Sequence, residues 1–176
     1  MSWDEYFFRI AQVVASNSKC LSRQIGAVLV KDKFIVSTGY NGPPAGVEHC
    51  ADRNMRWAKD GFLKWFPIKD FKRTCTRRLL GYESGEGLNW CPAAHAERNA
   101  IDIAARLGHS TEGCTLYLTW LIPCLECAKS IINAGIVEVV VGGFGSYDKE
   151  GITGKELLEG AKVKIRLYDF LEEEGE

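Results

Sequence analysis

The second half of the chain alternates between helix-like and strand-like patterns, and this alternation restricts the fold more than any other feature. Apolar residues recur at helical spacing over about 95–107 and 124–135, and the strand-like runs TLYLTW and IVEVVVGG follow these two helices. The second run is almost continuously apolar, as expected for a strand covered on both faces. This alternation predicts an α/β domain, a three-layer α/β/α sandwich with a mixed sheet of about five strands.

The two ends of the chain supply the remaining elements of that sandwich. Ser2 and Glu5 form a capping box that predicts a helix over about 3–17. The runs IGAVLV and FIVSTGY, separated by KDK, predict a β-hairpin, and the loop NGPPAG follows it. A short helix near TGKELLEGA and a last strand, KVKIRLY, complete the expected elements.

The length of 176 residues suits one domain, so we expect residues 1–176 to fold as a single unit. An irregular insertion is expected at about 51–90. There a helix-like stretch, DRNMRWAKDGFLKWF, precedes the basic KDFKRTCTRR and the glycine-rich GYESGEG. The acidic C-terminal tail, about 169–176, is expected to be solvated.

Charge and hydropathy exclude several classes of partner. The formal net charge is -1, whereas binding to nucleic acid through a broad basic face needs clustered Lys and Arg. No apolar run approaches the roughly 18 residues that span a bilayer. The first ten residues also lack the basic and apolar regions of a signal peptide. We therefore expect a cytoplasmic protein that binds neither membranes nor nucleic acid.

The seven cysteines indicate metal chemistry. In a reducing compartment, cysteines bind metal, act in catalysis or pack as small apolar residues more often than they form disulfides. Cys124 and Cys127 are three residues apart at the expected start of a helix, directly after Pro123, and therefore share a face. With His95 they would offer two thiolates and an imidazole. This set leaves the fourth position of tetrahedral zinc open for water, as in catalytic sites.

Glu97 lies only two residues after His95, so the two side chains cannot share a side face of a helix. They can converge only if the site lies off the helix end. There Glu97 would take a proton from water on the zinc and deliver it to a ring nitrogen of the substrate. Taken alone, C-x-x-C is also typical of redox motifs and of half a structural zinc site.

The H-x-E and P-C-x-x-C motifs together resemble those of the zinc-dependent cytidine and deoxycytidylate deaminase superfamily. The stretches SRQIGAVLVKDKFIVSTGYNGPPAGVEHC, CPAAHAERNAI and IPCLECAKSIINAGI are similar to deoxycytidylate (dCMP) deaminases in particular, over about residues 3–145. The resemblance implies zinc-dependent hydrolysis of dCMP to dUMP and ammonia, which supplies dUMP for thymidylate synthesis. His95, Cys124 and Cys127 would hold the zinc, and Glu97 would be the catalytic acid and base.

The same resemblance implies residues that bind the nucleotide. Arg23 would contact the 5′-phosphate, because a guanidinium matches phosphate bidentately. Asn41 would bind the sugar or the phosphate, and Tyr147 would line the nucleotide pocket.

Members of this family are often hexamers that dCTP activates and dTTP inhibits. The resemblance therefore implies a homo-oligomer, expected to be a hexamer, with a site for dCTP or dTTP. The residues implied at that effector site are Gly39, Tyr40, Asn41, Gly42 and Arg106.

A second, structural zinc is also implied. Related deaminases, including a phage type, bind it through cysteines that match Cys20 and Cys50, and Cys75 and Cys91 would complete the site here. The phage pattern uses His and Glu for its other two ligands, and His49 is an alternative to one of the cysteines.

Other functions remain open from the residues alone. A tRNA adenosine deaminase shares both motifs but needs a basic face for RNA. A cytidine deaminase would not need the phosphate contact, and dCTP is an alternative nucleotide substrate. A non-catalytic zinc module, for instance in a DNA-uptake or repair assembly, would have no use for Glu97.

Overall fold

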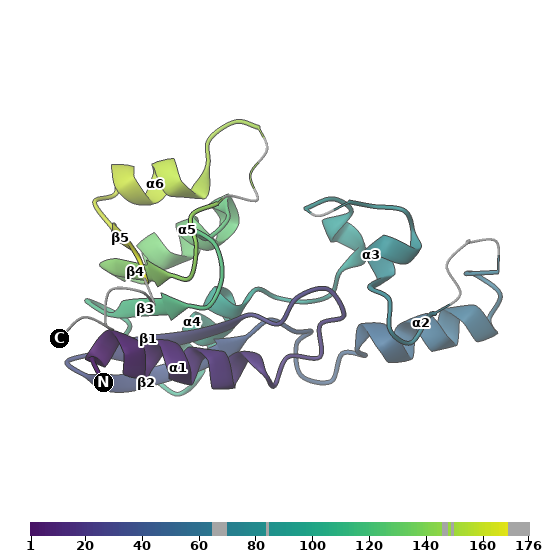
Figure 1. The fold of residues 1–176 in the computed structure, drawn as a ribbon, viewed down its shortest axis with the longest axis horizontal. Coiled ribbons are helices and arrows are strands. Elements are labelled where there is room, and N and C mark those ends of the chain that lie inside the picture. Colours follow the sequence, from purple (N-terminus) through teal and green to yellow (C-terminus); the bar gives the residue numbers. More distant parts are fainter. Residues whose placement is uncertain (65–69, 84, 146–147, 149, 169–176) are drawn as a thin grey trace.

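In the computed structural model, which describes residues 1–64, 70–83, 85–145, 148 and 150–168, one mixed sheet has the strand order β2-β1-β3-β4-β5 (Figure 1). Its strands are β1 (Gly26–Lys31), β2 (Phe34–Tyr40), β3 (Thr115–Leu118), β4 (Glu138–Val141) and β5 (Lys164–Leu167). β1 pairs antiparallel with β2 and with β3, whereas β4 is parallel to both β3 and β5. The predicted α/β fold with a mixed five-stranded sheet is confirmed.

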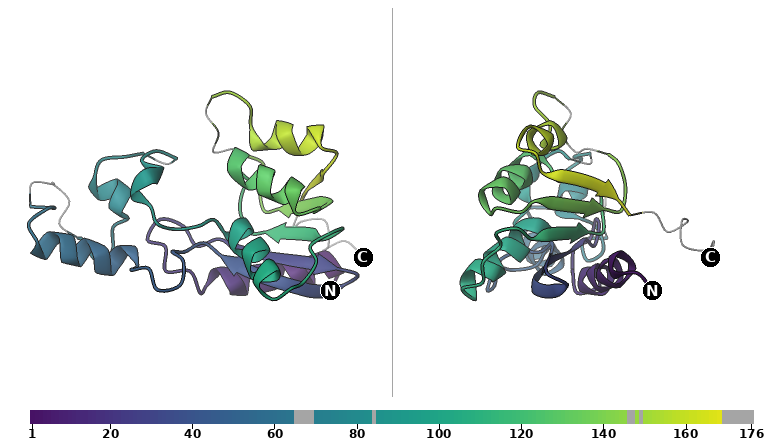
Figure 2. Two further views of the ribbon diagram at one scale, coloured as in Figure 1. Left: turned by 180° about the vertical axis from the view of Figure 1, so that it is seen from behind. Right: turned by 90° about the vertical axis from the view of Figure 1, so that its left-hand side faces the viewer.

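Helices cover both faces of this sheet and produce the three layers (Figure 2). Helix α1 (Trp3–Ala15) packs on one face. Helices α4 (Ala96–Arg106), α5 (Leu125–Asn133) and α6 (Gly154–Gly160) pack on the other. Side chains alternate along β1, so that Leu29 joins the core beneath α4 to α6 while Val28 joins the core beneath α1. Burial on both faces explains why the central strands are largely apolar, with polar residues such as Lys31 and Glu138 at their ends.

The insertion forms an arm that projects from the sheet (Figure 1). It contains α2 (Cys50–Lys59), α3 (Thr76–Leu79) and a 3₁₀ turn, η1 (Leu88–Trp90). The sequence predicted a longer helix, over 52–66. Helix α2 ends at Lys59 because the chain turns at Gly61, whose φ of 84° suits a residue without Cβ.

Hydrogen bonds of two side chains on α2 hold the arm together. The fully buried Asn54 donates to the backbone oxygens of Phe71 and Thr74 and accepts from the Thr76 hydroxyl. Arg53 donates from Nη2 to Thr76 Oγ1 at 2.8 Å and to the backbone oxygen of Trp90 at 3.0 Å. The arm therefore combines these buried polar groups with buried apolar side chains such as Leu63 and Leu79.

The predicted acidic tail, 169–176, lies outside the described residues. No helix in the described part of the chain combines the length and the apolar character needed to cross a membrane.

Gly39 in β2 allows α4 to approach the sheet closely. A Cβ at this position would lie far inside van der Waals contact with the backbone nitrogen of Ala100 and the backbone oxygen of Ala96. The Ser37 hydroxyl donates to the backbone oxygen of Ala100 at 2.7 Å in the same contact. Because α4 starts directly after His95, this close approach sets where the predicted metal ligand lies.

We expect Gly39→Ala to lower the free energy of unfolding by about 1–3 kcal/mol, the usual cost of overpacking a tight contact. Urea unfolding followed by circular dichroism measures the change. The matched control is Gly160→Ala at the end of α6, where an added Cβ would meet no atom within 4 Å. Equal unfolding midpoints for the two variants would show that the contact between α4 and β2 is not tightly packed.

Candidate metal and active site

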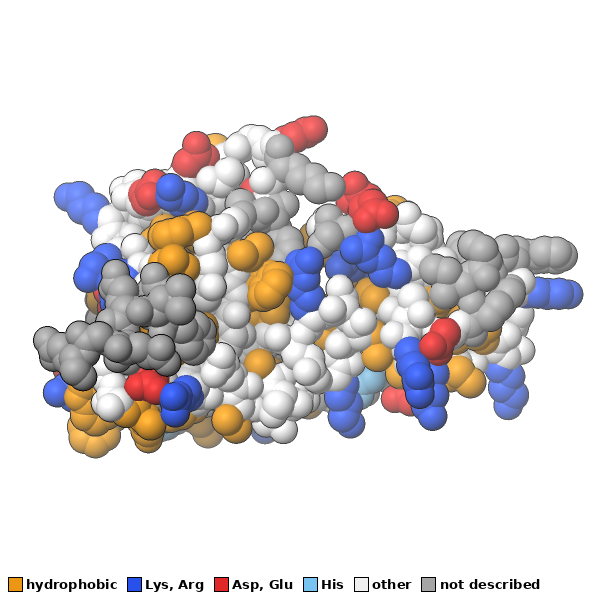
Figure 3. Space-filling view, in the orientation of Figure 1, with side chains coloured by type: hydrophobic (Ala, Val, Ile, Leu, Met, Phe, Trp, Pro, Cys, Tyr) orange, Lys and Arg blue, Asp and Glu red, His pale blue; other side chains and the backbone are white. Residues whose placement is uncertain are grey.

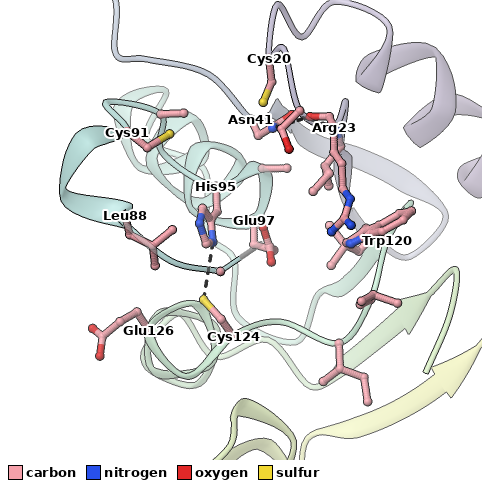
Figure 4. A pocket seen from close by; sticks show the side chains of 18 of the residues that line it. Cys20, Arg23, Asn41, Leu88, Cys91, His95, Glu97, Trp120, Cys124 and Glu126 are labelled. Atoms are coloured by element: carbon pink, nitrogen blue, oxygen red, sulfur yellow. Dashed lines mark hydrogen bonds between the residues drawn. The ribbon is translucent and has the colours of Figure 1, made fainter. Parts of the chain in front are cut away.

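Three predicted metal ligands come together beside the sheet. His95 Nδ1 lies 3.5 Å from Cys124 Sγ and 3.3 Å from Cys127 Sγ. The dashed line in Figure 4 marks the first of these contacts. The three ligand atoms lie within 4.8 Å of one another. They therefore form a compact group of one nitrogen and two sulfurs.

The N-terminal ends of two helices position this group. His95 is the residue before α4, and Cys124 is the residue before α5, with Cys127 in the first turn of α5. The positive ends of the helix dipoles therefore face the sulfurs and favour the thiolate form of cysteine. The site lies off the helix ends, which is the arrangement that the spacing of His95 and Glu97 requires.

The spacing of the three atoms fits zinc. Zn–S bonds of about 2.3 Å and Zn–N bonds of about 2.0–2.1 Å, at a tetrahedral angle, separate nitrogen from sulfur by about 3.6 Å. The observed separations of 3.5 and 3.3 Å are close to this value. The donor set, two sulfurs and one imidazole, is also one that zinc prefers.

Hydrogen bonds within the group shift the pKa values of its members. The hydrogen bond from Cys127 is the main cause that lowers the pKa of Cys124 to about 4, against the opposing effect of burial, and the contact with His95 lowers it further. The same sulfur–sulfur contact and burial raise the pKa of Cys127. The contact with Cys124 raises the pKa of His95. One thiolate is therefore already favoured next to an imidazole before any metal binds.

Glu97 is the buried acid of this site. It belongs to the first turn of α4, and only 6% of its surface is exposed. Burial raises the pKa of its carboxyl group above the usual value, against the opposing effect of His95. In Figure 4 its side chain points into the same space as the His95 ring. A carboxyl group in this position can carry a proton at the metal end of the cavity.

A cavity of about 370 Å³ opens from this group, a volume typical of sites for small molecules. Arg23, which precedes β1, lines it, and its guanidinium lies 4.7 Å from the centre of the Trp120 ring. Figure 4 shows this pair across the cavity from His95. Sequence reasoning selected Arg23 but missed Trp120, because an aromatic residue after a strand is ordinarily a packing residue.

Asn41 lines the same cavity and also organises its wall. Its Oδ1 accepts from the Ile25 backbone at 2.8 Å, and its Nδ2 donates to the backbone oxygen of Arg23 at 2.8 Å. Its own backbone oxygen accepts from the Ser18 hydroxyl at 2.7 Å. The amide therefore ties the segment that carries Arg23 to the end of β2.

Asp148 is a second supporting residue that sequence reasoning missed. Its carboxylate accepts from the backbone nitrogen of Leu125, at 3.2 and 3.3 Å, and from that of Gly154 at 2.7 Å. It thus holds the start of α5, beside Cys124, against the start of α6. No sequence motif marks this role. Its neighbour Tyr147, predicted to line the pocket, lies outside the described residues.

The residues implied at an effector site lie along α4. Gly42 pairs with Ala94 at the N-terminal end of α4, where the backbone bonds between them measure 3.1 and 2.9 Å. Arg106 is exposed in the last turn of the same helix. At 1.5 Å per residue, the length of α4 places these positions about 15 Å apart.

The remaining predicted zinc ligands lie nearer the arm. Cys50 begins α2, Cys75 precedes α3, and Cys91 follows η1. Burial raises the pKa of Cys50, and the charges of Cys91 and Cys75 add to this effect. Cys20 and Cys91 both line the cavity. Of the residues that the structure describes, only His95, Cys124 and Cys127 place three ligand atoms within 4.8 Å of one another.

Comparisons with known proteins agree with this geometry. Residues 1–143 match the sequence model of the cytidine and deoxycytidylate deaminase zinc-binding region. The chain is 38% identical to the deoxycytidylate deaminase of enterobacteria phage T4, over 89% of this chain and 85% of the phage protein. It is 34% identical to ComE operon protein 2 of Bacillus subtilis, over 97% of this chain and 73% of that protein.

A solved structure with the same fold is the dCMP deaminase of cyanophage S-TIM5, in complex with dCMP and dUMP. The TM-score is 0.64 at 23% identity, and the match covers 93% of this chain and 95% of the phage chain.

We expect Asn41→Ala to lower the free energy of unfolding by about 1–3 kcal/mol, because it leaves partly buried backbone groups of Ile25 and Arg23 without their partner. Thermal or urea unfolding measures this change. Asn133→Ala, at an exposed position at the end of α5, is the control and should stay within about 0.5 kcal/mol of the parent. An Asn41 variant as stable as the control would contradict the structural role of the amide.

Proposed function

The chain belongs to the cytidine and deoxycytidylate deaminase family, and within this family we propose that it hydrolyses dCMP to dUMP and ammonia, supplying dUMP for thymidylate synthesis. The observation that carries the proposal is one cavity with two chemically different ends. At one end a metal-binding group adjoins the buried acid Glu97, and at the other Arg23 lies against Trp120. The first end suits hydrolysis of a C–N bond, and the second suits an anionic group on the substrate.

We assign the catalytic zinc to His95, Cys124 and Cys127, which leave one tetrahedral position open. A zinc ion held there would supply a nucleophile for C4 of cytosine at neutral pH, since a metal of this kind lowers the pKa of water from about 15.7 towards 7. The helix ends behind Cys124 and Cys127 stabilise the two thiolates. Asp148 holds α5 in position through the amide of Leu125.

Glu97 moves the protons of the reaction. It would take a proton from the attacking water and deliver it to the ring nitrogen next to C4. It would then take the second proton from the oxygen that has become bonded to C4 and deliver it to the amino group, which leaves as ammonia while C4 becomes a carbonyl. Its burial supports this role, because a carboxyl group with a raised pKa holds a proton more readily than an exposed one. Water is kept from the other sides of the carboxyl group by the same burial.

Arg23, Asn41 and Tyr147 are the residues that we assign to the nucleotide. The guanidinium of Arg23 would bind the 5′-phosphate, and the stacking on Trp120 supports this because it holds the guanidinium in one plane. Asn41 would contact the sugar or phosphate. Its amide makes one hydrogen bond at Oδ1 and one at Nδ2 to the backbone, so a second donor and a second lone pair are left for the nucleotide. A phosphate contact favours a nucleotide over cytidine.

We propose further that the protein acts as a cytoplasmic homo-oligomer, a hexamer, with dCTP and dTTP as effectors. The free cysteines support a reducing compartment. Exposed aromatic side chains, such as Phe34 at 75% exposure and Trp3 at 51%, support burial against another subunit. Gly42 and Arg106 lie at opposite ends of α4, which supports an effector site shared between two chains.

We also propose a structural zinc held by Cys50, Cys75 and Cys91, with Cys20 as the fourth ligand and His49 as its alternative. The arm supports this proposal because it is a small unit, and small units are commonly stabilised by a metal. The charges of Cys75 and Cys91 contribute to the raised pKa of Cys50, which supports the proximity of these three thiols. Their side chains would have to turn towards a common ion.

We expect elemental analysis to find two zinc ions per chain, and one in Cys75→Ser. The variant should also become more sensitive to limited proteolysis in the arm, because the metal would no longer connect α2, α3 and η1. Cys114→Ala, at the start of β3 and outside both sites, is the control and should keep two ions. One zinc per chain in the parent protein would reject the structural site.

An ammonia-release assay on dCMP, dCTP, deoxycytidine, cytidine and adenosine-containing tRNA tests the proposed activity. We expect dCMP to be the preferred substrate. Glu97→Gln should keep its catalytic zinc but lose at least about 10²-fold in kcat, the lower range for loss of a general acid–base. Zinc content is measured on the same sample. A folded, zinc-loaded Glu97→Gln enzyme with full activity would contradict the role of Glu97, and a parent protein without activity on dCMP would contradict the substrate.

A further inference from the structure

The arm contributes one basic side chain to the cavity. Arg77, in α3, lines the same cavity as His95 and Glu97. Its neighbour Arg78 pairs with Glu83 at 2.6 Å, and Arg56 pairs with Glu48 at 2.9 Å. Within the described part of the chain, Arg77 has no carboxylate partner. Its Nη1 donates instead to the backbone oxygen of Glu86 at 2.6 Å. The positive charge of Arg77 is therefore not matched by a neighbouring acid in the described structure.

A buried donor of Arg77 also lacks an acceptor. Its Nε is buried and has no hydrogen-bond partner, and the same is true of the indole Nε1 of Trp120. Both residues line the cavity. An unpaired buried donor costs about 1–3 kcal/mol, so such groups call for an explanation where they occur. An anionic ligand with several oxygens would supply acceptors close to both residues.

The acids that line the cavity already have other partners. Glu126 pairs with Lys129 at 2.6 Å. Asp148 accepts hydrogen bonds from the backbone at the starts of α5 and α6. Glu97 lies at the metal end, beside His95. Away from the metal, an anionic ligand can therefore balance the positive charge of Arg77.

The arm lies across the cavity from Arg23. Figure 4 places Leu88 of the arm on one side of His95, and Arg23 with Trp120 on the other. Arg77 belongs to the arm side, where its bond to Glu86 connects α3 with the segment before η1. Basic side chains also gather in the region between the arm and the sheet in Figure 3. A ligand with its base at Glu97 would extend between these two sides.

Hydrogen bonds between buried polar groups of the arm hold α3, which carries Arg77, in place. Thr76, the residue before Arg77, accepts from Arg53 Nη2 at 2.8 Å and donates to Asn54 Oδ1 at 2.7 Å. Thr76 is buried at 1% exposure, so the backbone beside Arg77 is firmly held by α2. A guanidinium on a fixed backbone loses less conformational freedom when it binds a ligand.

We propose that Arg77 is a specificity-determining residue of the substrate site, and that it binds the 5′-phosphate of the nucleotide from the side opposite Arg23. The inference rests on the proposed function and gives the arm a part in substrate binding. The phosphate offers three oxygens, enough for two guanidinium groups to bind at once. The arm thus adds a second positive charge to that of Arg23, and strengthens the selection of nucleotides over nucleosides.

The test compares Arg77→Gln, Arg77→Lys and the control Arg78→Gln with the parent enzyme, using dCMP and deoxycytidine as substrates. We expect Arg77→Gln to lower kcat/KM for dCMP by about 10- to 100-fold, the usual range for a hydrogen bond to a charged group. Its kcat/KM for deoxycytidine should stay within about twofold of the parent, because no phosphate is present. Arg77→Lys should recover part of the loss, since it keeps the charge but not the planar fork. Arg78→Gln should match the parent on both substrates, because Arg78 pairs with Glu83 and does not line the cavity.

Equilibrium binding of dUMP and deoxyuridine, measured by calorimetry, separates this inference from the proposed function. Arg77→Gln should weaken dUMP binding by a similar factor and leave deoxyuridine binding unchanged. Equal losses on phosphorylated and unphosphorylated ligands, or no loss on either, would overturn the role of Arg77. If the parent releases no ammonia from dCMP, the proposed function fails, and the role of Arg77 is then decided by these binding measurements alone.

Discussion

The site depends on the meeting of two helix N-termini at one point beside the sheet. His95 immediately precedes α4 and Cys124 immediately precedes α5, so a nitrogen and two sulfurs come within ligand distance without any distortion of either helix. The unpaired amide groups at these ends favour negative charge, which the two sulfurs would carry as thiolates when a metal is bound. The close approach of α4 to Gly39 and the bracing of α5 by Asp148 keep the two ends together.

The two ends of the cavity differ in their charged groups as a result of this arrangement. At the metal end, a buried carboxyl group with a raised pKa adjoins the imidazole and the sulfurs. At the opposite wall, Arg23 is held on Trp120 and its backbone is tied down by Asn41. A substrate that is neutral at its reacting ring and anionic at its other end matches this distribution of charge, and a nucleotide has both features. The arm adds a further cation to the lining of the cavity, Arg77.

Much of the fold was predictable because each element has a strong local pattern. The S-x-x-E box at Ser2 marks the start of α1 in the structure, and the apolar run around Val139 forms a central strand. Prediction was weaker in the insertion, where α2 ends at Lys59 rather than near residue 66. That stretch has few apolar residues with a clear period, and its structure depends on hydrogen bonds of Asn54 and Arg53 to distant segments.

The sequence by itself determined the metal-binding group and the acid, because two helix-start motifs, H-x-E and P-C-x-x-C, specify both residue types and local geometry. It also indicated Arg23 and Asn41 through resemblance. Only the tertiary structure decided that Trp120 lies against Arg23, that Asp148 joins two helix starts, and that Arg77 reaches the cavity from the arm. These relations join segments far apart in the chain, and no local spacing encodes them. They arise from how the sheet, the helices and the arm pack together.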